Sequence, residues 1–223
     1  MPPARRRSTR DRPAKAPLSE QAVVDAALAV LKSEGLEAVS MRRVAAALDT
    51  GPASLYVYVP NREGLLRAMQ DRIFALVEFE AADPARWREQ LHALLGRLRA
   101  ALASHPGIAA TIMAVSPRSE ASLLVLENLL AVLLAGGMPP REAGWTADIL
   151  ATLVNHAAAE TESRAADDRH QPDDMYRHFA SQSPDTFPLI TAHAAQLVAG
   201  DAEERFRRAV DAVVDGFLAR QAD

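Results

Sequence analysis

The residues whose spacing best suits catalysis or metal binding are His156 and Glu160, which lie one helical turn apart. That spacing is compatible with a metal site or with acid/base chemistry. The sequence offers no third convergent ligand, no HExxH or GxSxG motif, no glycine-rich phosphate loop and no cysteine nucleophile. We therefore predict that the chain is not an enzyme and that it uses no metal and no cofactor.

A second kind of chemistry is the recognition of nucleic acid, and its candidates lie in the segment PASLYVY, residues 52–58. If this segment is helical, Leu55 and the following Val59 point toward the rest of the protein. The side chains left outside are short or uncharged: Pro52, Ala53, Ser54, Val57 and Tyr58. A helix that enters the major groove needs such residues for close approach, with hydroxyls for base edges and phosphates. A solvated helix would instead carry Lys, Glu or Arg on that surface.

Four helices must position this segment. Each begins at a residue that favours a helix N-terminus, namely Ser19, Ser40, Pro52 and Asn61. Residues 49–51 form a three-residue turn between the second and third helices, and the fourth helix is expected to continue to Val77. Two short helices joined by such a turn, and packed on a longer helix in front of them, predict a helix-turn-helix.

The stretch SMRRVAAALDTGPASLYVYVPNREGLL, residues 40–66, resembles the DNA-binding signature of the tetracycline repressor (TetR) family, and the resemblance extends back to the first helix. The matching positions are Arg42, Val44, Ala45, Leu48, Leu55, Tyr56, Val59, Asn61, Leu65 and Leu66. Asp49 stands where the family usually has glycine, and Asp tolerates a left-handed conformation better than most residues. Thr50 replaces an apolar turn residue, and Pro52 stands where a polar base-reading residue often lies.

The resemblance implies a role for each residue near the DNA. Arg42 should read a base, with Ser40 and Met41 beside it. The residues that should line the groove are Pro52, Ala53, Ser54, Val57 and Tyr58. Those that should hold phosphates are Tyr56 and Arg62. An alternative interpretation makes Tyr56 a core residue whose hydroxyl reaches water. For Arg43, a solvated charge is favoured over a DNA contact.

From about residue 83 the chain is helical again. The segment SLLVLENLLAVLLAG is apolar on nearly every side, which predicts a central, buried helix. A further helix is expected from Glu142 to Ser163, and two opposite faces of it lack charge over most of their length. One face carries Trp145, Ile149, Thr152, His156 and Glu160. The opposite face carries Ala147, Leu150, Val154 and Ala158. We expect the protein's own interior to cover one side and a second subunit the other.

The last helix, Asp201–Arg220, carries Phe206, Val210, Val213, Val214 and Phe217 on one face. Together with Glu142–Ser163 it resembles the pair of helices through which the TetR family dimerises as a four-helix bundle. Dimerisation also fits DNA recognition, because one short helix reads few base pairs and a two-fold dimer on a palindromic site reads twice as many.

For a ligand pocket in this second domain, the candidates are mostly apolar with a few polar groups: Phe74, Phe79, His92, Met113, Asn128, Trp145, Thr152 and His156. The competing interpretation is that the aromatic residues belong to the core and that His156 is an ordinary hydrogen-bonded histidine. Glu78 stands where the tetracycline repressor has its magnesium-linked histidine, so neither tetracycline nor a metal is inferred.

Composition and charge fit this organisation. The 223 residues are 49% hydrophobic and 24% charged, without cysteine and without an apolar run long enough to span a bilayer. Residues 1–72 hold 12 Lys and Arg against 8 Asp and Glu, and the remainder holds 13 against 21. We therefore expect an all-α, cytoplasmic protein whose basic N-terminal third meets a polyanion. Its expected parts are a flexible basic arm (1–17), a helix-turn-helix domain (18–66), a connecting fourth helix (67–82) and an effector-binding and dimerisation domain (83–223).

The function that these observations favour is a ligand-responsive transcriptional regulator. By the resemblance, it is a repressor that a small apolar or amphipathic effector releases from a palindromic operator. Its expected partners are double-stranded operator DNA, the effector and a second copy of the chain, with no membrane. Two alternatives stay open: a helical interaction protein that has lost DNA binding, and a small all-α enzyme.

Overall fold

The structure of the protein is a computed structural model, which describes residues 17–111, 119–166 and 172–220. Its elements are α1 (Glu20–Glu34), η1 (Leu36–Ala38), α2 (Met41–Ala47), η2 (Pro52–Ser54), α3 (Arg62–Phe74), α4 (Trp87–Ala103), α5 (Ile108–Thr111), α6 (Glu120–Ala135), α7 (Pro140–Ala166), α8 (Pro172–Ala180), α9 (Pro188–Ala192), α10 (Ala194–Val198) and α11 (Ala202–Ala219). No strand occurs in these residues, and the predicted all-α fold class is confirmed. Residues 1–16 of the predicted arm (1–17) and the predicted ligand residue Met113 lie outside the described residues.

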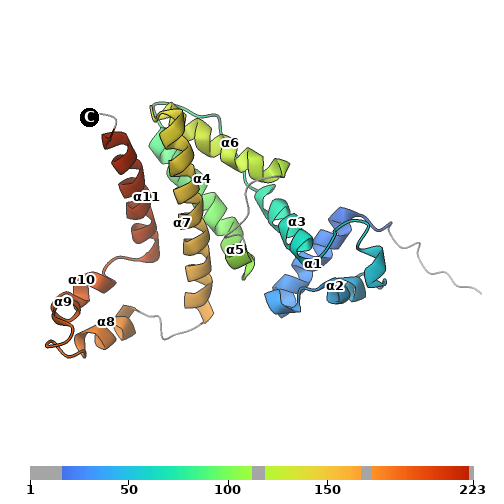
Figure 1. Cartoon of the computed structure of the whole chain (residues 1–223), viewed down its shortest axis with the longest axis horizontal. Helices are drawn as coiled ribbons and strands as arrows, with labels where there is room; N and C mark the ends of the chain where they lie inside the picture. The colour runs from blue at the N-terminus through green and yellow to red at the C-terminus, as the bar shows by residue number, and fades with distance from the viewer. Residues whose placement is uncertain (1–16, 112–118, 167–171, 221–223) are drawn as a thin grey trace, which may run out of the picture.

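The helices form two groups (Figure 1). At one end, α1 packs against α2 and α3. In the other group, α7 packs against α4, α6, α5 and α11, while α8, α9 and α10 pack on one another. Contacts of α3 with α6, α4 and α5 join the groups, and their buried side chains form a single apolar cluster from Val23 to Val214.

Capping explains where several helices begin. The side-chain oxygens of Ser19, Ser40 and Asn61 accept hydrogen bonds from the backbone N–H groups three residues later, as predicted. Asp201 caps α11 in the same way by accepting from Glu204 N. These bonds satisfy donors that the first helical turn leaves unpaired.

The structure corrects three predicted elements. The third helix is a short 3-10 helix, η2, followed by hydrogen-bonded turns to Tyr58 and not by a regular α-helix. The fourth helix ends at Phe74, although Val77 is still buried. The helix α6 is not buried on all sides: Leu129 and Leu133 lie in the core, but Leu123 and Leu124 are about half exposed. No element of the described chain covers that second face of α6, which periodicity alone could not reveal.

Candidate nucleic-acid interface and effector site

The segment 52–58 presents the predicted outer surface on two buried anchors. Leu55 is 0% exposed and Val59 is 2% exposed, so both pack inward as expected. The residues that remain exposed are Pro52, Ala53, Ser54, Tyr56 and Val57, which we call the candidate DNA surface. Its side chains are short or uncharged, and Val57 is 80% exposed. An aliphatic side chain so open to water suits a partner that offers apolar contact, such as the methyl groups of thymine.

The turn before this surface takes the conformation that the sequence predicts. Asp49 has φ 50°, and it is the one non-glycine residue with positive φ among those described. The chain then reverses, with Thr50 N donating to Ala45 O at 2.9 Å and Thr50 Oγ1 donating to Ser54 Oγ at 3.3 Å. The hydroxyl of Thr50 therefore ties the turn to the candidate DNA surface, a use that an apolar residue at this position could not provide.

Two residues predicted to lie at the DNA face inward instead. Met41 is 9% exposed and belongs to the core, because the first turn of α2 packs against α1. The Tyr58 hydroxyl donates a 2.7 Å hydrogen bond to Leu18 O, and its ring packs on the core. Tyr58 thus holds the start of α1, and its place in the DNA groove stays a prediction. Arg42, next to Met41, is exposed.

Arg62 also has a structural role that its sequence position did not reveal. Its Nε donates to Val39 O at 2.8 Å, and its Nη2 donates to Leu36 O at 3.2 Å. Both carbonyls belong to the connection between α1 and α2. The guanidinium therefore braces that connection, while Arg62 stays exposed and its phosphate contact stays a prediction.

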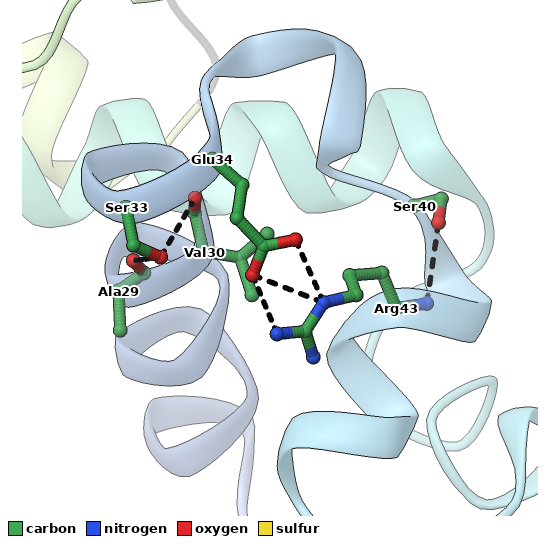
Figure 2. Close-up of polar contacts among 6 residues, drawn as sticks. All are labelled: Ala29, Val30, Ser33, Glu34, Ser40 and Arg43. Atoms are coloured by element: carbon green, nitrogen blue, oxygen red, sulfur yellow. Dashed lines mark hydrogen bonds and ion pairs between the residues drawn. The ribbon is translucent and has the colours of Figure 1, made fainter.

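Arg43 is held by an acidic partner (Figure 2). Its Nε lies 2.9 Å from Glu34 Oε2, and its Nη2 lies 2.5 Å from Glu34 Oε1, which joins the end of α1 to α2. Hydrogen bonding by Arg43 lowers the pKa of Glu34 below its ordinary value of 4.5, and the same bond raises the pKa of Arg43. Since folding lowers the Glu34 pKa, the pair stabilises the folded state above pH 4.5, and this contribution is lost as the pH falls through the lower folded value.

The variant Arg43→Gln tests this pair. The pKa of Glu34 should rise to its ordinary value, because the charged hydrogen-bond donor is gone. A pH titration of the Glu34 carboxyl carbon by NMR measures the change, and Arg86→Gln, which breaks an exposed ion pair with Glu89, serves as the control. An unchanged Glu34 pKa in Arg43→Gln would show that the pair does not form in solution.

The predicted ligand residues on α7 do not enter the protein. Trp145 is 51% exposed with the Arg141 guanidinium 4.6 Å from its ring centroid, and Thr152 and His156 are exposed as well. With Ile149 they form the outer face of α7. The opposite side of α7 is buried as predicted, and it carries Ala147, Leu150, Val154 and Ala158. The helical stripe on the outer face was correctly identified, and its contact with a ligand stays a prediction.

Other predicted ligand residues have partners within the fold. Phe74 is buried in the core, and His92 Nε2 lies 2.8 Å from Asp211 Oδ1, which links α4 to α11. The apolar face of α11 covers α7 of the same chain, with Phe206, Val210 and Val214 buried. Among the described residues, no group of three or more His, Asp or Glu side chains could hold a metal ion.

Two predicted residues do share a hollow in the second group of helices. It is small, about 10 Å³, which is room for about one water molecule. It is lined by Phe79, Glu80, Gln90, Leu94, Arg97, Asn128 and Val132. These residues come from the connection before α4, from α4 and from α6. The hollow therefore joins apolar walls to a charged pair, since Arg97 Nη1 donates to Glu80 Oε1 at 3.0 Å.

Sequence reasoning missed Arg97, whose Nε is buried without a hydrogen-bond partner in the described part of the chain. It also missed Gln90, which is 6% exposed, accepts from Asp83 N and donates to Ala81 O. A signal existed in each case, because both residues lie within the apolar repeat of Leu91, Leu94 and Leu98. Polar residues at such positions need partners, and the helix register alone does not reveal which partners they find.

No helix of the described chain is both long enough and apolar enough to cross a membrane. Comparison with protein families matches residues 23–69 to the bacterial regulatory proteins of the tetR family and residues 80–221 to the tetracyclin repressor-like C-terminal domain.

Individual relatives agree with this assignment. The transcriptional repressor DrrR1 of Streptomyces coeruleorubidus is 42% identical over 99 residues, which are 43% of this chain and 37% of that protein. A transcriptional regulator of Saccharopolyspora erythraea is 26% identical over 209 residues, covering 91% and 85% of the two chains. The TetR family protein ActR of Streptomyces coelicolor, solved with actinorhodin, is 32% identical with a TM-score of 0.82, covering 92% of this chain and 97% of that one. These relatives are transcriptional regulators and not enzymes. The chain belongs to the TetR family of transcriptional regulators.

Proposed function

We propose that this regulator is a homodimeric, cytoplasmic repressor that a small amphipathic effector releases from a palindromic operator. One observation carries the DNA part of the proposal: the exposed, uncharged surface of residues 52–57 stands on the buried Leu55, and the exposed Arg42 lies on α2, which packs against η2. Small side chains let the backbone approach base edges, and an arginine can pair with guanine through two hydrogen bonds.

The outer face of α7 supports dimerisation. Trp145 and Ile149 are 51% and 39% exposed on a helix whose other side is fully covered. On the neighbouring α11, Asp211 and Asp215 contact α4. At 100° per residue, the small side chains of α11 then lie on the side away from α4: Ala209, Ala212 and Gly216. Two such helix pairs could meet as a four-helix bundle, with aromatic and aliphatic groups of one helix against small residues of another.

The hollow between α4, α6 and the connection before α4 is the proposed effector site. Its lining residues lie on α4, on α6 and on the connection that follows α3, and α3 contacts both helices, so a molecule that spreads these helices would move α3 and the DNA-binding helices with it. ActR, which aligns with 92% of this chain, was solved in complex with actinorhodin, and this supports a small-molecule ligand for this protein. An effector that binds more tightly to the DNA-free conformation must lower the DNA affinity by the same coupling energy.

A gel-shift assay with DNA from upstream of the protein's own gene and the neighbouring genes tests the DNA contact. Arg42→Ala should lower specific affinity by about tenfold or more, since one bidentate base contact contributes about 1–3 kcal/mol of discrimination. Arg86→Ala is the matched control, because it removes an exposed arginine near the start of α4. Equal affinity of Arg42→Ala and wild-type protein would reject the assignment, and absence of any sequence-selective binding would favour a helical interaction protein.

A further inference from the structure

The residues on the outer face of α7 are spaced symmetrically about one point of the helix. They fall at equal distances on the two sides of the bond between Leu150 and Ala151: Arg141, Trp145 and Ile149 before it, and Thr152, His156 and Glu160 after it. We propose that a second copy of the chain packs its α7 antiparallel to this one, with the two-fold axis at that point. Each residue then meets the one at the same distance from the axis: Arg141 meets the partner's Glu160, Trp145 the partner's His156, and Ile149 the partner's Thr152. This inference rests on the dimer of the proposed function.

The charges at the two ends of this face favour the antiparallel direction. Arg141 is exposed, and its guanidinium lies 4.6 Å from the ring centroid of Trp145, without a carboxylate partner among the described residues. Glu160 lies at the opposite end of the same face. Because a two-fold interface repeats each contact, an antiparallel pair of helices forms the contact between Arg141 and the partner's Glu160 twice. A parallel pair would instead place arginine against arginine and carboxylate against carboxylate, and like charges repel.

The spacing of the face suits the packing of one helix on its copy. Positions 141, 145 and 149 form one row with i, i+4 spacing, and positions 152, 156 and 160 form another. Such rows are the ridges that pack between the ridges of a neighbouring helix. Trp145 and Ile149 bring apolar surface near the axis, since they are 51% and 39% exposed in the single chain. Arg141 and Glu160 lie about 14 Å along the helix from the axis, and both side chains are long enough to reach across helices that diverge.

The placement of α7 in the molecule gives the same direction independently. Figure 1 shows α7 running across the direction that leads from α11 to α1, α2 and α3. Both copies must present their DNA-binding helices to one duplex, so the two-fold axis has to run toward those helices. That axis therefore crosses α7 and does not run along it, and a two-fold axis that crosses a helix relates two antiparallel copies.

Paired cysteine substitutions test the register, because the chain has no cysteine of its own. Positions 145 and 156 lie about 16 Å apart along one helix, whereas a disulfide needs Cα atoms within about 7 Å, so no bond can form inside one chain. Under mild oxidation, at a concentration where sedimentation shows dimers, Trp145→Cys/His156→Cys should become a covalent dimer in most chains. Each single variant should stay unlinked. Arg141→Cys/His156→Cys is the matched control, because its positions are one helical turn out of register and should not link.

Charge reversal gives a second measurement on the full-length protein. Arg141→Glu should weaken dimerisation in sedimentation equilibrium by about tenfold or more, because it replaces two attractive contacts per dimer with two repulsive ones. Arg141→Glu/Glu160→Arg should recover dimerisation to within about threefold of the wild-type value. A double variant that dimerises as weakly as Arg141→Glu would contradict the pairing of these two residues.

The outcomes separate the register from the dimer itself. Linking of positions 145 and 156 alone, with recovery in the charge-reversed double variant, supports the inference. A dimer that links through the single Trp145→Cys variant, through the control pair or through neither refutes this register and leaves the proposed dimer standing. A wild-type protein that sediments as a monomer would show that a second copy does not cover this face, and it would overturn both proposals.

Discussion

Replacing Ile149 with glutamate should convert the dimer to monomers and lower operator affinity by about 100-fold or more. Ile149 lies in the middle of the outer face of α7, between Trp145 and Thr152, and is 39% exposed in the single chain. In the proposed bundle, the new carboxylate would be buried without a cation to pair with. The free-energy cost of burying an unpaired charge exceeds what one side chain contributes to the stability of the interface. A monomer would then contact one half-site, and specific binding by such proteins depends on two.

Sedimentation of the free protein and a gel shift at matched protein concentrations measure these two effects. Leu123→Glu is the control, because it places the same charge at a half-exposed aliphatic position on α6, away from the proposed interface. An Ile149→Glu protein that remains dimeric would contradict the assignment of this face. A monomer that still binds the operator with wild-type affinity would instead contradict the need for two half-sites.

Replacing Leu55 with alanine should lower the free energy of unfolding by about 2–5 kcal/mol, the usual cost of truncating a buried leucine. Leu55 is 0% exposed and lies directly under the candidate DNA surface. The segment around it is a 3-10 turn with few backbone hydrogen bonds of its own. Its shape therefore depends on this anchor, and we expect operator affinity to fall along with stability. Urea unfolding at a fixed protein concentration gives the free energy, since any dimer makes it concentration-dependent.

Val57→Ala is the matched comparison, because Val57 is 80% exposed only two residues away. Its truncation should change stability by no more than about 0.5 kcal/mol, while still weakening operator binding through lost apolar contact. The interpretation fails if Val57→Ala destabilises the protein as much as Leu55→Ala does, or if Leu55→Ala costs less than about 1 kcal/mol.

Features that depend on neighbours in the chain were predicted well. Ser19, Ser40 and Asn61 cap the helices assigned to them, and Asp49 takes the left-handed conformation of the turn. The inward direction of Leu55 was also correct. Each of these follows from contacts within a few residues, where backbone geometry restricts the choices.

Features that depend on distant partners were not predictable in the same way. Tyr58 was assigned to DNA, but its hydroxyl reaches Leu18, forty residues earlier, and Arg62 reaches the carbonyls of Leu36 and Val39. Long polar side chains can reach several places from one backbone position. Which acceptor they reach is decided by elements that only the fold brings alongside.

The sequence by itself determined the helical architecture and the helix-turn-helix, because these follow from local capping and apolar periodicity. The family was identified by the resemblance of residues 40–66 to its DNA-binding signature. Only the tertiary structure decided which apolar stripe is covered. Both sides of α7 have the composition of a buried surface, yet α4, α6 and α11 cover one of them and leave Trp145 and Ile149 outside. It likewise decided that Arg97, at an apolar position of α4, keeps a buried donor that finds no partner among the described residues. The physical reason is that periodicity gives the direction of a side chain relative to its own helix, whereas burial and pairing depend on what packs against that helix.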